Sequence, residues 1–256
     1  MIETTVEKIR ELDIGDRVKV TGVVAVEPGV LGAQYFYLLG TSTSSPAGVQ
    51  VYQHSKDFTS LTPGEVVQAI GEISEAYGET RVKVKSRADI QIVGEKRDVA
   101  PAALAAAEIG DNVVGALVEV EGEITERKSS YFYLDDGSEE ARVYLKAGAL
   151  IESGQIAVGQ TVRVVGIVGG RNGQYQLLPR RAADIVPVAN DGKGDIALYS
   201  DPVNKERDLA ETYLTATAGG LTSILIGLMA RARGALVFGF LKRLGAIALV
   251  LIRRKV

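Results

Sequence analysis

The sequence lacks cysteine and tryptophan, and its 256 residues include a single histidine, His54. Without cysteine the chain can form no disulfide, no thiolate metal site and no thiol nucleophile, and one imidazole cannot build a histidine-based zinc site. We therefore expect no metal and no cofactor. The absence of cysteine is compatible with an oxidising or a reducing compartment.

Catalytic motifs are missing as well. The carboxylates most closely grouped in sequence stand in the string "DDGSEE", which is typical of a hairpin turn, and no base or nucleophile joins them by motif. These acidic residues are Asp135, Asp136, Glu139 and Glu140. We expect a binding protein and not an enzyme.

Charge is divided unequally along the chain. The net charge is −3, but residues 214–256 hold seven Lys and Arg and no acidic residue. The preceding 213 residues therefore hold 22 basic against 32 acidic side chains, a net charge of −10. A basic tail on an acidic body indicates that the tail alone meets nucleic acid or a membrane surface.

An internal repeat organises the rest of the sequence. The first copy contains "QYFYLL", "PGEVVQAIGEI" and "RADIQIVG", and the second contains "SYFYLDDG", "VGQTVRVVGIV" and "AADIVPVA" in the same order and at similar spacing. Chance could supply one such pair but not the whole series. We therefore interpret the chain as a duplication.

Each copy shows five short segments that alternate apolar and polar residues and are separated by Gly, Pro, Ser and Asp. Five strands with an insertion between the third and the fourth are typical of a Greek-key barrel of the OB type. In the second copy, "AGALIESGQI" within residues 147–156 could form a short helix in that insertion.

The predicted fold is therefore all-β, with two tandem five-stranded OB-type barrels followed by a helical tail. The predicted domains are a first barrel at residues 1–97, an Ala-rich connector at 98–112, a second barrel at 113–188, a polar linker at 189–212 and a membrane anchor at 213–256.

The second and third strands carry the ligand face of an OB barrel, and the loops between strands one and two and between four and five flank it. In the second copy, one set of alternate residues is apolar and should fill the core, so the other set should point outward. The outward set and its flanking loops contain Arg127, Lys128, Tyr131, Tyr133, Arg142, Tyr144, Lys146, Arg171, Asn172 and Tyr175.

The first copy repeats this chemistry with fewer cations in its loops. Its predicted outward residues are Tyr35, Tyr37, Gln50, Tyr52, Arg81, Lys83 and Lys85. Tyrosines interleaved with cations favour single-stranded nucleic acid, because bases stack on the rings and cations follow the phosphates. The alternative interpretation is an ordinary solvated sheet face, and the net charge of −10 on residues 1–213 argues against strong nucleic-acid binding.

The strings "VKVTGVV", "QYFYLL", "SYFYLDDG" and "GVQVY", with the closing "ADI" segments, resemble the nucleic-acid-binding OB-fold repeats of bacterial cell-surface proteins. Such repeats often accompany lamin-tail or nuclease domains, neither of which is present here. The resemblance covers residues 12–188. It implies an OB fold and a nucleic-acid-binding or accessory role outside the membrane. OB barrels also bind oligosaccharides and proteins, so a surface spacer module with those partners is the alternative.

The C-terminal tail predicts contact with a lipid bilayer. Residues 214–230 carry no charge, follow Tyr213 and precede Arg231, and their length is at the lower limit for a membrane span. Residues 231–255 are apolar with basic residues gathered toward one side, which is typical of an amphipathic helix in the headgroup region.

Basic residues after the span place the C-terminus in the cytoplasm and the barrels outside. Export would need a signal, and the charged start "MIETTVEKIRELDIGD" does not resemble one. Two interpretations remain. The chain is part of a longer exported protein, or it is tail-anchored with cytoplasmic barrels.

Overall fold

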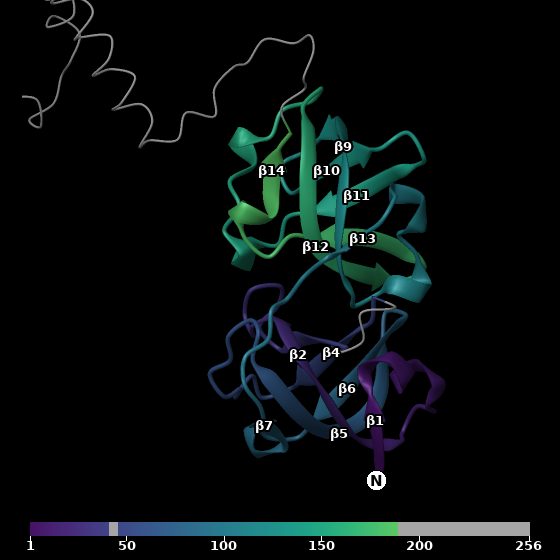
Figure 1. Ribbon diagram of the computed structural model, residues 1–256, viewed down its shortest axis with the longest axis vertical. Helices are drawn as coiled ribbons and strands as arrows, with labels where there is room; N and C mark the ends of the chain where they lie inside the picture. Colours follow the sequence, from purple (N-terminus) through teal and green to yellow (C-terminus); the bar gives the residue numbers. More distant parts are fainter. Residues whose placement is uncertain (41–45, 189–256) are drawn as a thin grey trace, which may run out of the picture. The chain divides into compact units, whose positions relative to one another are not determined.

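The computed structural model describes residues 1–40 and 46–188, and in this part the regular secondary structure consists of β-strands and short 3-10 turns (Figure 1). The strands of the first copy are β1 (Ile2–Thr5), β2 (Arg17–Val26), β3 (Tyr35–Leu39), β4 (Gly48–Gln53), β5 (Val66–Ala76), β6 (Glu79–Val84) and β7 (Ile90–Ile92). Those of the second are β8 (Ala102–Ala103), β9 (Leu117–Arg127), β10 (Tyr131–Asp135), β11 (Glu140–Tyr144), β12 (Thr161–Arg171), β13 (Gln174–Leu178) and β14 (Ile185–Pro187).

Both copies close into five-stranded barrels with the same strand order. In the first, β2 pairs with β3, β3 with β4, β4 with β6 and β6 with β5, and β5 returns to pair with β2. The second barrel has the order β9-β10-β11-β13-β12 and closes between β12 and β9. In each barrel the third and fifth strands pair in parallel and the other pairs are antiparallel. This is the Greek-key order of an OB fold, so the predicted fold of the two barrels is confirmed.

The duplication extends beyond the barrels. β1 adds to β2 in parallel and β7 adds to β5 antiparallel, and β8 and β14 make the same additions to β9 and β12. β8 lies within residues 98–112, so part of the segment predicted as a connector joins the sheet of the second barrel.

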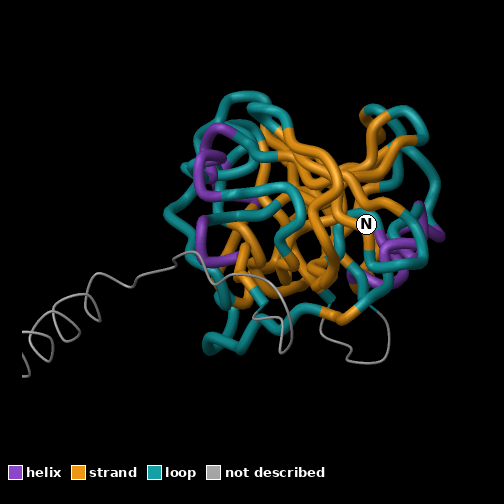
Figure 2. Tube along the Cα trace, turned by 90° about the horizontal axis from the view of Figure 1, so that it is seen from above, coloured by secondary structure: helices purple, strands orange, loops and turns teal. Residues whose placement is uncertain are grey.

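Short 3-10 turns occupy the connections between strands. They are η1 (Val6–Glu11), η2 (Arg87–Asp89), η3 (Ala106–Glu108), η4 (Asp111–Val113), η5 (Ala147–Ala149), η6 (Ser153–Gln155) and η7 (Ala182–Asp184). The segment expected to form one short helix at residues 147–156 instead forms η5 and η6. Leu150 interrupts them because its φ of 53° is left-handed and cannot continue a right-handed helix. Seen end-on in Figure 2, the strands gather at the centre and the turns and loops surround them.

Each barrel has its own apolar core, built from the alternate residues that the sequence predicted to point inward. Phe36 and Leu38 lie in the first core, and Phe132, Leu134 and Val143 lie in the second. All five side chains are fully buried. The period of two in the sequence therefore identifies the inner faces correctly.

A third apolar cluster joins the two barrels. The first barrel contributes the end of β2, the following loop and β3, while the second contributes the start of β9, β12 and the end of β13. Its buried members are Ala25, Val26, Leu31, Tyr37, Leu117, Ile167 and Leu178. Arg180 also donates a hydrogen bond of 3.1 Å to the carbonyl of Ala25, and Arg10 donates one of 2.7 Å to the carbonyl of Val114. The barrels are therefore packed on each other through a shared apolar interface.

Glycine lets the two backbones approach at this interface. Gly48 at the start of β4 lies against Gly115, and a Cβ atom at either position would overlap the backbone of the other. A larger residue at either position would push the barrels apart.

The predicted linker, membrane span and amphipathic helix at residues 189–212, 214–230 and 231–255 lie outside the described residues. Within the described part, no helix has the length and apolar character that crossing a membrane requires.

Candidate nucleic-acid interface

The outer face of β10 and β11 carries a row of alternating aromatic and basic side chains. Pairing of the two strands places Tyr131 opposite Tyr144 and Tyr133 opposite Arg142. These four residues occupy the positions between the core residues, so they point away from the barrel interior. Lys146 lies two residues beyond the end of β11, at a position of the same parity.

These side chains contact one another. The Arg142 guanidinium lies 4.4 Å from the ring centroid of Tyr131 and 5.5 Å from that of Tyr144. Lys146 Nζ lies 5.4 Å from the Tyr144 ring, and the rings of Tyr131 and Tyr133 meet edge to face at 5.8 Å. We call these five residues the second-barrel ladder. Such cation–π contacts hold the charges close to ring faces.

The cations of the ladder form no direct ion pair with a carboxylate of the described residues. In the part of the chain that the structure describes, neither Arg142 nor Lys146 forms an ion pair, and Arg142 Nε is buried without a hydrogen-bond acceptor. Arg127, the last residue of β9, is likewise exposed and unpaired within these residues, whereas Lys128 in the loop before β10 pairs with Glu126 at 2.6 Å. The charges of Arg127, Arg142 and Lys146 are therefore available for an anionic ligand.

The β12–β13 hairpin places the remaining predicted residues of the second barrel differently. Arg171 and Asn172 are exposed at its tip. Tyr175 is half-buried and packs against the second core, so most of its ring is occupied by the protein.

The first-barrel face is covered, which corrects the expectation that it is open. Tyr37 points away from the core of its own barrel, as predicted, but only 1% of it is exposed because it belongs to the cluster between the barrels. Gln50 is buried too and donates a hydrogen bond of 3.1 Å to the Tyr37 hydroxyl. Strand alternation shows which way a side chain points but not what packs on it.

The edge of this first-barrel face stays accessible. The Arg81 guanidinium lies 4.0 Å from the centroid of the half-buried Tyr52 ring. Lys83 is exposed beside Tyr52 in the β4–β6 pairing, and Lys85 is exposed just past the end of β6. Tyr35 is half-buried, and its hydroxyl donates a hydrogen bond of 2.6 Å to the carbonyl of Leu31.

A cavity of about 350 Å³ lies where the two barrels meet. It brings together seven of the predicted residues, namely Tyr35, Tyr37, Gln50, Tyr52, Arg81, Lys146 and Arg171. The other predicted residues do not line it: Lys83, Lys85, Arg127, Lys128, Tyr131, Tyr133, Arg142, Tyr144, Asn172 and Tyr175. Lys146 belongs to both sets, so the second-barrel ladder ends at the cavity.

Glu79 is the residue in this cavity that the sequence analysis missed. It is 7% exposed and receives hydrogen bonds from the Tyr37 hydroxyl and the backbone N–H of Gly170. Burial raises its pKa to about 7, although these hydrogen bonds and Lys146 favour the charged form. The sequence did contain a signal, because Glu79 has the same strand parity as Arg81 and therefore lies on the same face.

Neighbouring groups respond to the same burial. Burial raises the pKa of Tyr35 to about 12, and the Glu79 charge adds to the effect. Burial lowers the pKa of Lys146, the Arg171 charge lowers it further, and Glu79 opposes both. The cavity is therefore a poorly solvated place in which one carboxyl group faces several cations and phenols.

Two tight hairpins close one side of the cavity. The β5–β6 hairpin turns at Tyr77 and Gly78 and the β12–β13 hairpin at Asn172 and Gly173, and all four residues have positive φ. Positive φ at both central residues is the geometry of a type I′ turn. The tips meet, because the N–H of Asn172 donates a hydrogen bond of 2.7 Å to the carbonyl of Tyr77. The Arg171 guanidinium lies 5.3 Å from the Tyr77 ring centroid.

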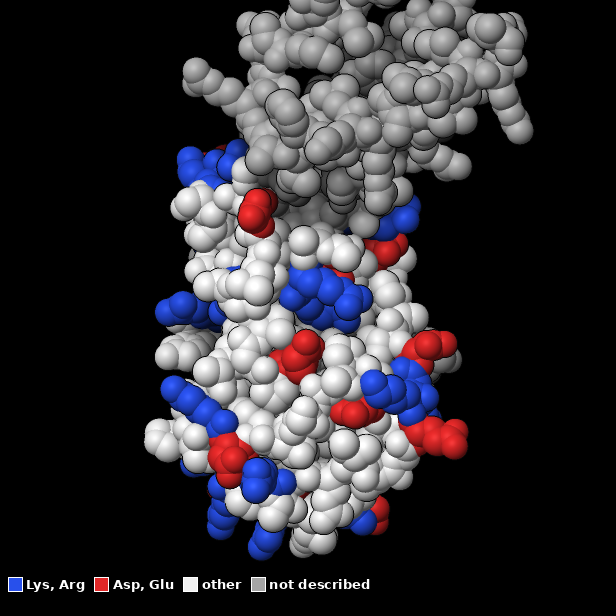
Figure 3. Space-filling model, turned by 90° about the vertical axis from the view of Figure 1, so that its left-hand side faces the viewer, with Lys and Arg blue, Asp and Glu red and all other residues white. Residues whose placement is uncertain are grey.

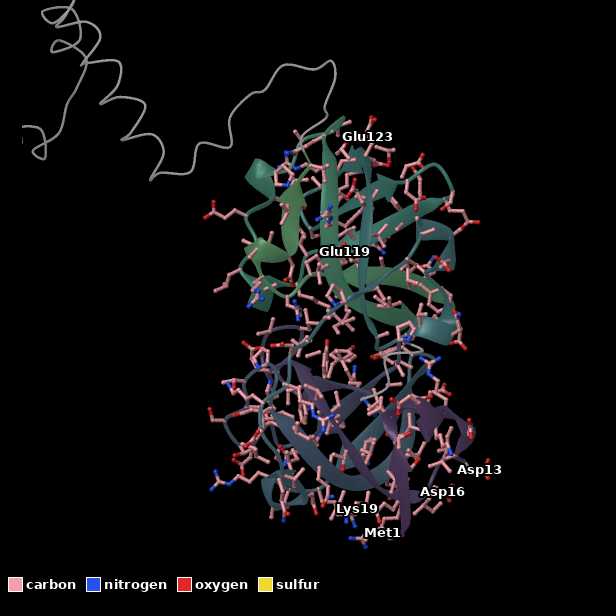
Figure 4. All side chains as sticks on the ribbon, viewed as in Figure 1. Met1, Asp13, Asp16, Lys19, Glu119 and Glu123 are labelled. Carbon is pink, nitrogen blue, oxygen red and sulfur yellow. The ribbon has the colours of Figure 1, made fainter. Side chains whose placement is uncertain are left out.

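Acidic residues gather on another strand pair. Figure 4 shows Glu119 and Glu123 at different heights along β9. Arg163 of β12 forms ion pairs with Glu119 at 3.5 Å and with Glu121 at 3.0 Å. On the face shown in Figure 3, basic and acidic side chains are interspersed over both barrels. The unpaired cations of the second-barrel ladder therefore differ from the paired charges of β9 and β12.

Asp135, Asp136 and Glu140 of the "DDGSEE" turn have structural hydrogen-bond partners. Asp136 accepts hydrogen bonds from the N–H and hydroxyl of Ser138 and from the N–H of Ala106, which ties the β10–β11 turn to η3. No group of three or more potential metal ligands occurs among the described residues.

Comparison with known proteins gives similarity to solved structures alone: no protein-family model and no curated protein matches the sequence. A murine DNA-binding protein bound to double-stranded DNA is 11% identical with a TM-score of 0.36, over 69% of this chain and 99% of that one. The telomere capping protein Ten1 from Saccharomyces pombe is 14% identical with a TM-score of 0.27, over 45% of this chain and 99% of that one.

An OB domain of MM0293 from Methanosarcina mazei is 11% identical with a TM-score of 0.29, over 37% of this chain and 87% of that one. Identities and TM-scores this low carry no argument about function. The OB topology of this chain therefore rests on its own strand order.

Proposed function

We propose that this chain binds single-stranded nucleic acid without catalysing a reaction on it, along the second-barrel ladder. The observation that carries the proposal is the set of Tyr131, Tyr133 and Tyr144 rings interleaved with the unpaired cations Arg142 and Lys146. Bases stack on such rings for about 1–3 kcal/mol each, whatever their sequence, while cations follow the backbone phosphates.

The neighbouring cations indicate the path that the bound nucleic acid takes over the barrel. Exposed Arg127 ends β9, which pairs with β10 on one side of the ladder, and Arg171 lines the cavity together with Lys146. A strand laid between them would cross β10 and β11, which form the ligand face of OB barrels in general.

The acidic body limits the affinity. With a net charge of −10 over residues 1–213, long-range attraction of phosphates is weak and only the local cations support binding. We therefore propose modest affinity that falls as the salt concentration rises.

Titration of a labelled single-stranded DNA at several salt concentrations tests the proposal. Tyr131→Ala should weaken binding by about 1–3 kcal/mol because one stacking ring is removed, and Tyr131→Phe, which keeps the ring, should weaken it much less. Absence of binding at low salt would refute the proposal.

A protein-binding role is the second candidate, because the equivalent face of the first barrel is already occupied by protein. Tyr37, the counterpart of Tyr133, is buried between the barrels. The second-barrel ladder could receive another protein in the same way, or an oligosaccharide that stacks on its rings. In that case Tyr131→Ala would weaken capture of that partner, and DNA affinity would be absent.

We also propose that residues 213–256 anchor the barrels to a membrane, with the barrels on the extracytoplasmic side as in the cell-surface proteins that the sequence resembles. The uncharged stretch at 214–230 and the basic residues that follow support this proposal. A chain truncated after residue 213 should no longer sediment with membranes. Protease added to intact cells should cleave the barrels of the full chain, and protection of the barrels would favour the cytoplasmic, tail-anchored arrangement.

A further inference from the structure

The cavity between the barrels has the dimensions of a ligand site. Its volume of about 350 Å³ falls at the lower end of the range for small-molecule pockets, about 300–1,000 Å³. It adjoins the second-barrel ladder through Lys146, which lines it. A single nucleotide unit of a bound strand therefore suits it better than a run of several.

One hydrogen-bond acceptor in this cavity is unused. Glu79 Oε1 is buried and has no hydrogen-bond partner among the residues that the structure describes, although the carboxyl group also receives the Tyr37 hydroxyl and the Gly170 N–H. A buried polar atom without a partner is costly, and it calls for an explanation such as a bound water, an ion or a ligand. Because Glu79 lines the cavity, a ligand there can supply the missing donor.

The position of Glu79 is fixed from both barrels. The Gln50 amide donates to the Tyr37 hydroxyl at 3.1 Å, and that hydroxyl in turn donates to the Glu79 carboxylate. Gly170 belongs to β12 of the second barrel, so its N–H holds the carboxylate from the opposite side. The unused oxygen is therefore pre-oriented before any ligand binds.

The rest of the lining suits a nucleotide. Tyr52, with the Arg81 guanidinium 4.0 Å from its ring centroid, offers a planar surface of the kind on which a base stacks. Lys146 and Arg171 supply positive charge for a phosphate. The lining contains the cations Arg81, Lys146 and Arg171, which would repel a cationic ligand. The group of the ligand that donates to Glu79 should therefore be a neutral N–H or O–H.

We propose that this cavity reads one base of the bound strand, with the Glu79 carboxylate accepting a hydrogen bond from an exocyclic amino group. This inference rests on the proposed strand binding and adds a base preference to it. Cytosine N4 and adenine N6 are amino donors, whereas thymine presents the O4 acceptor at the equivalent place, where it would face the carboxylate unfavourably. The cavity should therefore favour cytosine or adenine over thymine.

The test compares labelled homopolymers of deoxycytidine, deoxyadenosine and thymidine of equal length, titrated into the full chain at low salt and at pH 8, where Glu79, with a pKa of about 7, is mainly charged. We expect the two amino-bearing polymers to bind roughly tenfold more tightly than the thymidine polymer, the factor that a buried carboxylate left without its donor would produce. In Glu79→Gln the amide can donate as well as accept, so the three affinities should converge.

Glu123→Gln is the matched control, because it makes the same change of charge at an exposed position of β9 outside the cavity. This variant should keep the preference for the deoxycytidine and deoxyadenosine polymers over the thymidine polymer.

Equal affinities for all three polymers in the unmodified chain would overturn the base-reading role and leave strand binding intact. A preference that persists in folded Glu79→Gln would overturn it as well. Absence of binding to any polymer would overturn strand binding and the base preference together. The comparison in the unmodified chain decides the matter even if Glu79→Gln fails to fold.

Discussion

The two barrels share one strand order and one pattern of outward tyrosines, yet they use the same face differently. Tyr35 and Tyr37 meet edge to face at 5.8 Å, as do their counterparts Tyr131 and Tyr133. In the first barrel the face is buried against the second barrel, and in the second it remains accessible. A duplicated surface can therefore become an internal interface in one copy and a candidate ligand site in the other.

The sharpest test of this difference is the same substitution at both counterpart positions. Tyr37→Ala removes a fully buried ring from the cluster between the barrels and should lower the free energy of unfolding by about 3–5 kcal/mol. Tyr133→Ala removes a half-buried ring and should lower it by less than about 1 kcal/mol. Urea denaturation measures both. Equal decreases would contradict the assignment of the two faces.

The sequence predicted the barrels well because their signals are local. Alternation within each strand, the turn residues and the repeat are all short-range patterns, and they identified both cores and the strand order. The packing of one barrel on the other depends on interactions between distant residues, such as Arg10 with Val114 and Arg180 with Ala25. Alternation carries no information about such interactions, so the burial of Tyr37 could not be predicted.

Glu79 illustrates the same limit within the candidate site. Its counterpart in the second barrel is the exposed Gln174, since both residues follow the Gly of a two-residue hairpin turn. Strand parity places both on the outer face. Burial raises the pKa of Glu79, and Gly170 of the other barrel lies close enough to hydrogen-bond its carboxyl group.

Titration of Glu79 should make the stability of the barrel pair depend on pH. Burial raises its pKa from 4.5 to about 7, so the folded chain holds this proton more tightly than the unfolded chain does. The stabilisation is complete below pH 4.5 and disappears as the pH rises through about 7, with a total near 3 kcal/mol. Tyr35 and Tyr37, which line the same cavity, have raised pKa values and stay neutral over this interval.

The measurement is the difference in unfolding free energy between the unmodified chain and Glu79→Gln, taken from pH 4 to pH 8. Glutamine stands at the counterpart position in the second barrel and does not titrate. We expect the difference to change by roughly 3 kcal/mol in favour of the variant as the pH rises. A constant difference would show that the carboxylate is solvated in the folded chain.

A smaller contrast lies inside the cores. Gln53 is completely buried in the first barrel, and neither atom of its amide has a partner in the described part of the chain. Its counterpart after the Tyr144 position is Leu145, which belongs to the second core. Gln53→Leu should therefore raise the free energy of unfolding by about 1–2 kcal/mol, because it replaces an unsatisfied amide with an apolar group. Thermal denaturation checks this. A decrease in stability would indicate that buried water satisfies the amide.

The smallest expected effect is on the salt dependence of DNA affinity, which should differ between variants of unpaired and of paired cations in and beside the second-barrel ladder. For single-stranded DNA, the slope of log affinity against log salt becomes shallower by about 0.7 for each phosphate that the protein no longer neutralises. Arg142→Gln, which installs the residue found at the counterpart position Gln50, should reduce the slope by this amount because Arg142 has no carboxylate partner among the described residues. Lys128→Gln should change it by much less, because Glu126 already neutralises Lys128 at 2.6 Å. Equal changes in the two variants would mean that the Lys128–Glu126 pair opens when the strand binds, so that the β9–β10 loop contributes to the site as fully as the ladder does.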